Sequence, residues 1–139
     1  MERLQERLVV ARRALETLQR LQLEKARSDD VIRDAAIQRF EYTFEAVWKA
    51  AQLYLREVEG LEVGSPKGVI RASFQVGIFD ENQARSALEM ADDRNLTVHT
   101  YNEALAQAIS SRIPDHVTLM ERWLEAMEER IERDKGSFT

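Results

Sequence analysis

The sequence predicts an all-α protein with three or four long antiparallel helices, joined by short connections and one or two short helices. Two Pro and five Gly in 139 residues leave few places where a helix must break. Apolar residues recur at spacings of three and four, as on the buried face of a helix. The only strand-like segment is residues 74–79, and its Gly77 favours a helix end instead. An apolar fraction of 44% is enough for one buried core.

The first helix is expected over residues 2–26. Its apolar stripe consists of Leu4, Leu8, Ala11, Leu15 and Leu18. Ser28 or Asp29 can cap a second helix that runs to about Glu59. The apolar face of this helix is broad, so it should pack against more than one neighbour; it comprises Ile37, Phe40, Phe44, Val47, Trp48, Ala51, Tyr54, Leu55 and Val58.

Four shorter helices are expected after a turn at residues 60–64. Ser65 caps the first of them, Pro66 occupies its first position, and it ends near Gly77. Asp80 caps a helix over 81–94, and Asn102 caps one over 103–112. Pro114 can open a last helix over 114–133, with a seam of Val117, Met120, Leu124, Met127 and Ile131. Such stripes pack a core within the chain or an interface between copies. We expect a single domain over 1–134 and a frayed tail over 135–139.

Composition excludes several functional classes. The net charge of −5 argues against a broadly basic nucleic-acid binder but leaves room for a local basic site. With no Cys and only two His, thiolate chemistry and a three-His zinc site are excluded, and we expect neither metal nor cofactor. No apolar run is long enough to span a membrane, and the first residues lack the layout of a signal peptide. The expectation is therefore a cytoplasmic protein.

The most informative segment is residues 92–102, which groups Arg94, Asn95, His99 and Tyr101. Histidine exchanges protons near neutral pH, and arginine binds phosphate and stabilises its developing charge. In a continuous α-helix Asn95 and His99 would share a face, whereas Arg94 and His99 would lie about 140° apart around the axis. Arg94 and His99 could then meet at one phosphate only through a helix break, a long side-chain reach or a second chain related by symmetry.

This segment resembles the Arg-x4-His-x-Tyr motif of HEPN-domain proteins, with Arg94, His99 and Tyr101 at its defining positions and Asn95 as the polar residue after the Arg. The blocks at residues 36–49, 65–71 and 94–103 resemble most the small HEPN proteins known as nucleotidyltransferase substrate-binding proteins. The likeness extends over about residues 2–133. Three ordered blocks in an all-helical chain are more specific than the motif alone.

The resemblance implies an up-and-down four-helix bundle that forms a homodimer with the motif at the dimer cleft. It also implies a partner, a minimal nucleotidyltransferase that acts as antitoxin to a HEPN toxin. Such a toxin is a metal-independent ribonuclease, and in some pairs the partner silences it by adding AMP to the motif tyrosine, here Tyr101. The alternative is that Tyr101 is only a packing residue near the start of the following helix.

The chain itself is not expected to transfer nucleotides. That reaction needs a Gly-Ser phosphate loop followed by paired carboxylates that hold Mg²⁺. Gly64 and Ser65 are present, but the next Asp is Asp80, and no Asp-x-Asp occurs. Any such activity must come from a partner.

Two functional hypotheses remain open from the sequence. In the first, the chain is an endoribonuclease in which His99 acts as acid and base, Arg94 binds the phosphate and Asn95 orients His99 or the substrate. In the second, it is a non-catalytic subunit that binds nucleotide or RNA and presents it to the nucleotidyltransferase. Two other sites are interpreted as structural: His116 as a first-turn surface residue, and Trp48 and Trp123 as packing residues.

Overall fold

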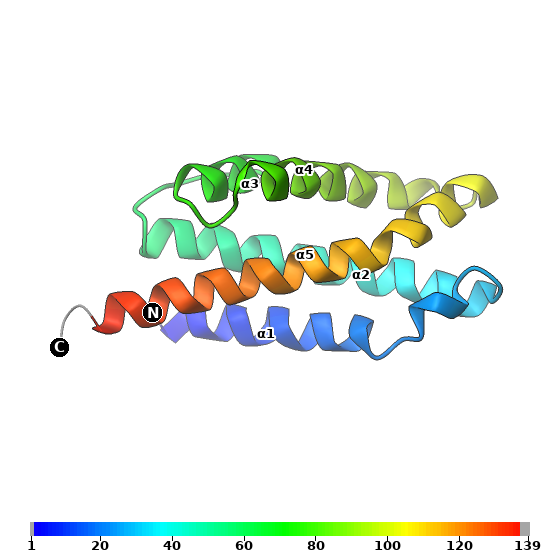
Figure 1. Ribbon diagram of the computed structural model, residues 1–139, viewed down its shortest axis with the longest axis horizontal. Helices are drawn as coiled ribbons and strands as arrows, with labels where there is room; N and C mark the ends of the chain where they lie inside the picture. Colours follow the sequence, from blue (N-terminus) through cyan, green and yellow to red (C-terminus); the bar gives the residue numbers. More distant parts are fainter. Residues whose placement is uncertain (1, 137–139) are drawn as a thin grey trace.

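The computed structural model describes residues 2–136, and these form helices without strands. The long helices are α1 (Glu2–Gln19), α2 (Asp30–Glu57), α4 (Glu81–Leu96) and α5 (Glu103–Gly136). The short α3 (Pro66–Gln75) precedes α4, and two 3-10 turns, η1 (Leu23–Lys25) and η2 (Thr97–His99), lie in connections. This is the predicted up-and-down bundle with additional short helices. The start of α1 and the end of α5 lie at the same end of the molecule (Figure 1).

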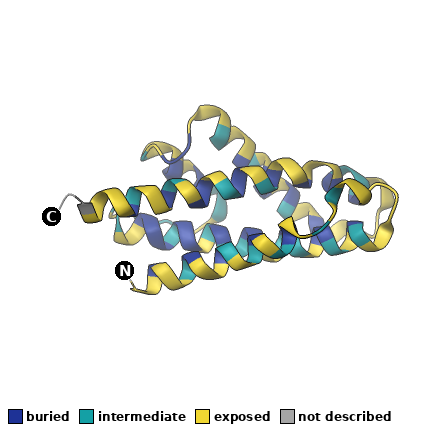
Figure 2. Ribbon diagram, turned by 60° about the horizontal axis from the view of Figure 1, so that its bottom comes forward, coloured by how far each residue is buried: buried dark blue, intermediate teal, exposed yellow. Residues whose placement is uncertain are grey.

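The core lies between the helices, where their dark-blue faces in Figure 2 meet. Every member of the predicted α1 stripe is buried, and α2 packs against α1, α3, α4 and α5 as its broad apolar face predicts. Trp123 is fully buried against Phe79, with ring centroids 4.9 Å apart, so its predicted packing role is confirmed. None of the helices described here is both long and apolar enough to cross a membrane.

The predicted helix starts are confirmed where capping side chains define them. Asp29, rather than Ser28, caps α2 by accepting from the amides of Val31 and Ile32. Ser65 accepts from the amide of Gly68 with Pro66 at the first position of α3. Asp80 and Gln83 form a reciprocal capping box at α4. Each cap satisfies amides that the first helical turn leaves without a partner.

Two predicted boundaries are wrong. The first helix was expected to reach residue 26, but α1 ends at Gln19; the chain then turns, and Leu21 and Leu23 of the connection pack on the core. Pro114 was expected to begin a new helix, yet it lies inside α5, which Figure 1 shows changing direction in its yellow-to-orange part. A mid-helix proline costs about 3 kcal/mol. The fully buried Ile109, Ile113 and Met120 on both sides of it contribute about 1.5–3 kcal/mol each by burial, which outweighs that cost.

The predicted tail divides at the end of the described chain. Residues 135 and 136 belong to α5, and residues 137–139 lie outside the described part.

Candidate functional site

The predicted motif lies at the α4–α5 connection. Arg94 and Asn95 belong to the last turn of α4, His99 ends η2, and Tyr101 lies just before α5. The α-helix therefore stops at Leu96. A single continuous helix, which would place Asn95 and His99 on one face, does not form. The helix break is present, and it redirects the chain between Arg94 and His99.

Local hydrogen bonds define the conformation of the connection. Thr97 is buried and its hydroxyl donates to the carbonyl of Arg94 at 2.7 Å. The Thr100 hydroxyl donates to the carbonyl of Thr97 at 3.1 Å. Asn102 then caps α5 by accepting from the amide of Leu105 at 3.1 Å, which confirms its predicted capping role. These contacts hold the connection in one backbone conformation while its other side chains remain open to solvent.

His99 and Tyr101 lie together on the outer surface. The Tyr101 hydroxyl is 3.4 Å from His99 Nδ1, and the two rings meet edge to face with centroids 5.9 Å apart. Tyr101 is 85% exposed and His99 and Asn95 are exposed as well. Within the described residues His99 Nε2 has no hydrogen-bond partner. Both the imidazole and the phenol are therefore accessible to a substrate or a second protein.

Arg94 points to α2 and not to His99. Its Nη2 lies 3.5 Å from Glu45 Oε1, a long contact at the limit of a hydrogen bond. Its Nε is buried and has no hydrogen-bond partner among the described residues. The guanidinium thus retains hydrogen-bonding capacity beyond its contact with Glu45. One chain brings His99 and Tyr101 together but leaves Arg94 separate from both.

A buried ionic cluster anchors the α4 side of the motif. Asp93 is 5% exposed and accepts two hydrogen bonds from Arg112, at 2.7 and 2.8 Å. His116 donates a third from Nε2 to Asp93 at 2.7 Å, and its ring stacks on Phe40 with centroids 5.2 Å apart. Burial raises the pKa of Asp93, but the bonds from Arg112 and His116 outweigh it and leave that pKa below its ordinary value. The cluster ties the end of α4 to α5.

His116 is therefore not the first-turn surface residue that the sequence suggested, and Asp93 is buried with it. His116 is buried because Pro114 continues α5 instead of starting it, so residue 116 lies in mid-helix. The spacing of Arg112 and His116 offered a signal, since residues four apart share a helix face. Glu45, the contact of Arg94, had no such signal because it lies 49 residues away in sequence.

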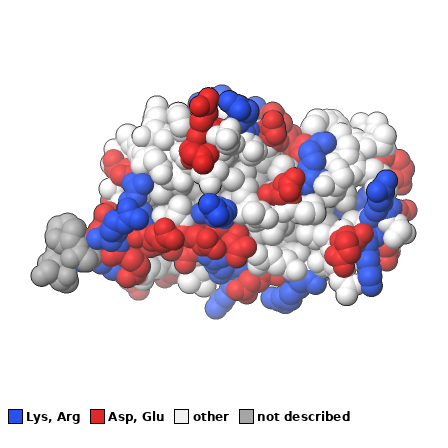
Figure 3. Space-filling model, in the orientation of Figure 1, with Lys and Arg blue, Asp and Glu red and all other residues white. Residues whose placement is uncertain are grey.

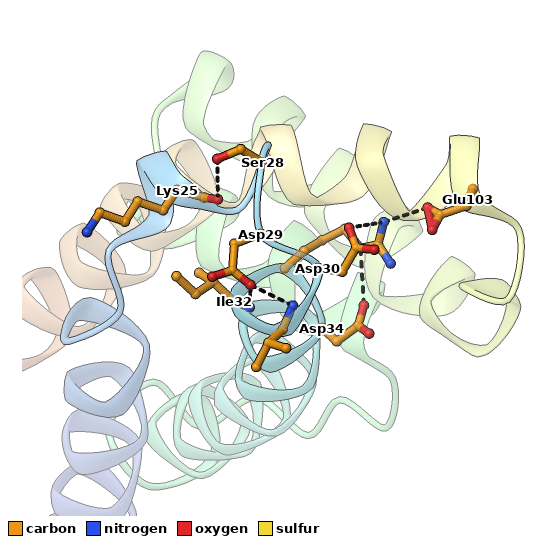
Figure 4. Close-up of polar contacts among 9 residues, drawn as sticks. Lys25, Ser28, Asp29, Asp30, Ile32, Asp34 and Glu103 are labelled. Atoms are coloured by element: carbon orange, nitrogen blue, oxygen red, sulfur yellow. Dashed lines mark hydrogen bonds and ion pairs between the residues drawn. The ribbon is translucent and has the colours of Figure 1, made fainter.

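A second ionic cluster anchors the α5 side of the motif. In Figure 4, Asp30 and Asp34 of α2 and Glu103 of α5 converge on one guanidinium. That group is Arg33, which is buried and lies 2.6 Å from Glu103, 3.1 Å from Asp34 and 3.5 Å from Asp30. The hydrogen bond with Glu103 is the main reason that the pKa of Arg33 is raised. The motif segment is thus fastened to the bundle at both ends.

Comparison with known proteins identifies similar chains. The family model described as "Nucleotidyltransferase substrate binding protein like" matches residues 6–129. A protein from Thermus thermophilus is 57% identical, with a TM-score of 0.78 over 84% of this chain and 98% of that one. No curated protein is significantly similar to the chain in sequence.

Two more distant structures share the fold. One is a Haemophilus influenzae protein described as showing the fold of a substrate-binding domain of a nucleotidyltransferase, at 21% identity and a TM-score of 0.73 over 87% and 98% of the two chains. The other is a tri-AMPylated HEPN toxin from Shewanella oneidensis in complex with its MNT antitoxin, at 16% identity and a TM-score of 0.73 over 91% and 96%.

Proposed function

We propose that this chain, which belongs to the family of nucleotidyltransferase substrate-binding-like proteins, is the HEPN toxin of a pair with a minimal nucleotidyltransferase and acts as a metal-independent ribonuclease. The observation that supports this most is the open hydrogen-bonding capacity of both motif side chains. His99 Nε2 and the buried Arg94 Nε lack partners within the described chain, whereas the Thr97 and Thr100 hydroxyls of the same connection are hydrogen-bonded.

The proposed chemistry divides between the two residues. The 2′-hydroxyl of the RNA attacks the adjacent phosphorus, and the bond from phosphorus to the 5′-oxygen of the next nucleotide breaks. His99 takes the proton of the attacking hydroxyl, and protonated His99 delivers one to the leaving oxygen. Arg94 stabilises the charge that develops on the phosphorane. Asn95 orients His99 or the substrate.

The proposal includes a homodimer, because Arg94 and His99 of one chain make no mutual contact. In such a dimer the two motifs face each other and supply one site from two chains. Exposed apolar side chains beside the motif support this arrangement, with Val98 66% exposed and Leu96 38% exposed. Val98→Asp is expected to convert a dimer into a monomer in light scattering. A wild-type monomer at micromolar concentration would contradict the dimer.

The test of the nuclease is an RNA cleavage assay in EDTA with protein that has never met its partner. Wild type should cleave, whereas Arg94→Ala and His99→Ala should each lose about 100-fold or more of the rate. Equal cleavage by His99→Ala and wild type would refute the assignment.

We further propose that Tyr101 is an AMP acceptor. Its hydroxyl oxygen attacks the α-phosphorus of ATP bound by the partner, the bond to the β-phosphate oxygen breaks, pyrophosphate leaves and the phenolic proton passes to solvent. Its 85% exposure supports access by a second protein. Intact mass after co-expression with the partner should show added AMP in wild type and in Tyr42→Phe, but not in Tyr101→Phe. No adduct on wild type with an active partner would count against it.

The second candidate is a non-catalytic subunit that binds nucleotide or RNA for the partner. The separation of Arg94 from His99 in one chain favours it. It predicts that unmodified protein binds RNA or nucleotide and leaves RNA intact over a long incubation. The Arg94→Ala and His99→Ala variants should likewise leave RNA intact.

A further inference from the structure

A groove of about 390 Å³ lies between the start of α1, the end of α2 and the segment that precedes α3. Its wall is held in place by Gln52, whose Nε2 donates to the carbonyl of Val63 at 2.7 Å. The charged residues that line this groove, here called the α1–α2 groove, are Arg3, Arg7, Lys49, Arg56 and Glu62.

The α1–α2 groove is basic in an acidic protein. Four cations and one carboxylate line it, although the chain has a net charge of −5. Within residues 2–136, no carboxylate lies within ion-pair distance of Arg3 or Arg7. Arg56 approaches Glu62 only at 3.8 Å, and both side chains are mostly exposed, so that pair neutralises little. Elsewhere, on the face shown in Figure 3, blue and red groups are interspersed.

The groove is continuous with the motif along one face of α2. Glu45, Lys49, Gln52 and Arg56 recur at spacings of four, three and four, which places all four on one side of the helix. Glu45 contacts Arg94 at 3.5 Å and Lys49 at 3.8 Å. From Glu45 to Arg56 the helix rises about 16 Å. A row of polar and cationic groups therefore extends from Arg94 into the groove.

We propose that the α1–α2 groove binds the phosphodiester backbone of single-stranded RNA and leads it to Arg94. This inference rests on the proposed ribonuclease function. Arginine binds phosphate through paired N–H donors, and the unpaired Arg3 and Arg7 have such donors available. The groove has no aromatic lining residue on which a base could stack, so it binds the backbone regardless of sequence.

The test is RNA binding by the full chain with His99→Ala, which prevents cleavage. The probe is a fluorescein-labelled single-stranded oligoribonucleotide, measured by anisotropy at several salt concentrations. Adding Arg7→Gln and Arg56→Gln should raise Kd about tenfold and reduce the slope of log K against log salt by about 1.4, which is two phosphate contacts. Arg13→Gln with Arg122→Gln is the matched control, with the same charge change outside the groove, and should change Kd less than twofold.

Conversion of Arg7 and Arg56 to lysine keeps the charge but not the paired donors, so it should weaken RNA binding less than conversion to glutamine does, which separates the effect of charge from that of folding. An equal loss of RNA affinity in the groove variants and the control variants would overturn the proposal. The absence of RNA binding by the His99→Ala chain would also overturn it. If the groove variants bind RNA normally but no longer bind the nucleotidyltransferase partner, the proposal is also overturned, and the groove is a protein interface.

Refutation of the groove proposal and refutation of the nuclease proposal would give different experimental results. If the groove variants cleave RNA with unchanged KM while His99→Ala is inactive, the nuclease stands and the groove is wrong. If no RNA is cleaved but binding depends on Arg7 and Arg56, the groove stands and the nuclease is wrong. A groove that serves the nuclease predicts a raised KM with kcat retained.

Discussion

Replacing Asp93 with asparagine tests whether the buried cluster anchors the end of α4. The carboxylate accepts three hydrogen bonds, two from Arg112 and one from His116. Asparagine has the same shape, but its amide nitrogen is a donor and must face one of these donors. The variant therefore loses at least one charge-assisted bond and leaves a donor without an acceptor.

The expected loss of unfolding free energy is about 3 kcal/mol. A hydrogen bond to a charged group contributes about 1.5–3 kcal/mol when one partner is removed. The side chain of Arg112 is 47% exposed and can be rehydrated, so its share lies at the lower end. The side chain of His116 is buried and cannot be rehydrated in this way. For a chain of this length, 3 kcal/mol corresponds to a decrease in Tm of about 10 °C.

Urea denaturation followed by circular dichroism measures this loss, and Asp92→Asn is the matched control. Asp92 is the adjacent residue and pairs with Lys67 at 2.6 Å, but its side chain is 58% exposed, so its loss should cost less than about 1 kcal/mol. Equal losses in the two variants would refute the assignment of Asp93 as an anchor.

The unfolding free energies of wild type and of Asp93→Asn should also depend differently on pH. The pKa of Asp93 is lowered in the folded state, so its contribution is complete above the unfolded-state pKa of about 4 and is lost as the pH falls through the folded-state pKa. Asparagine does not titrate. The stability gap between wild type and Asp93→Asn should therefore narrow below about pH 4, and a gap that widens there would contradict the sign of the shift.

Two further predictions concern helices. Pro114→Ala should raise the unfolding free energy by about 1 kcal/mol in urea denaturation, because residue 114 regains an amide that can donate to the carbonyl of Ser110; a loss would mean that the core requires the bend. Gly68→Ala should lower it by about 1 kcal/mol despite the higher helix propensity of alanine, because the new Cβ would lie 2.6 Å from Val63 Cγ1 and 2.8 Å from Ser65 Oγ. Gly64→Ala has open space and should be near neutral by the same assay.

The sequence was sufficient for the helical class, for most helix starts and for the family. Apolar periodicity predicted the buried stripes, and Asp29, Ser65, Asp80 and Asn102 predicted the helix starts, since a cap is a contact between residues two or three apart. The resemblance drawn from three blocks is confirmed by the family match over residues 6–129. The homodimer and the roles of the motif residues remain predictions.

The sequence by itself determined that the chain is helical, where most helices begin and which segment bears the candidate motif, because these depend on near neighbours. The tertiary structure alone decided that α5 continues through Pro114, that Asp93 and His116 are buried together, and that Arg94 faces Glu45 instead of His99. The physical reason is that in each case a local cost, such as a missing amide or a buried charge, is outweighed by packing and hydrogen bonds from another helix. The partners lie 19 to 49 residues away, and only the folded bundle brings them into contact.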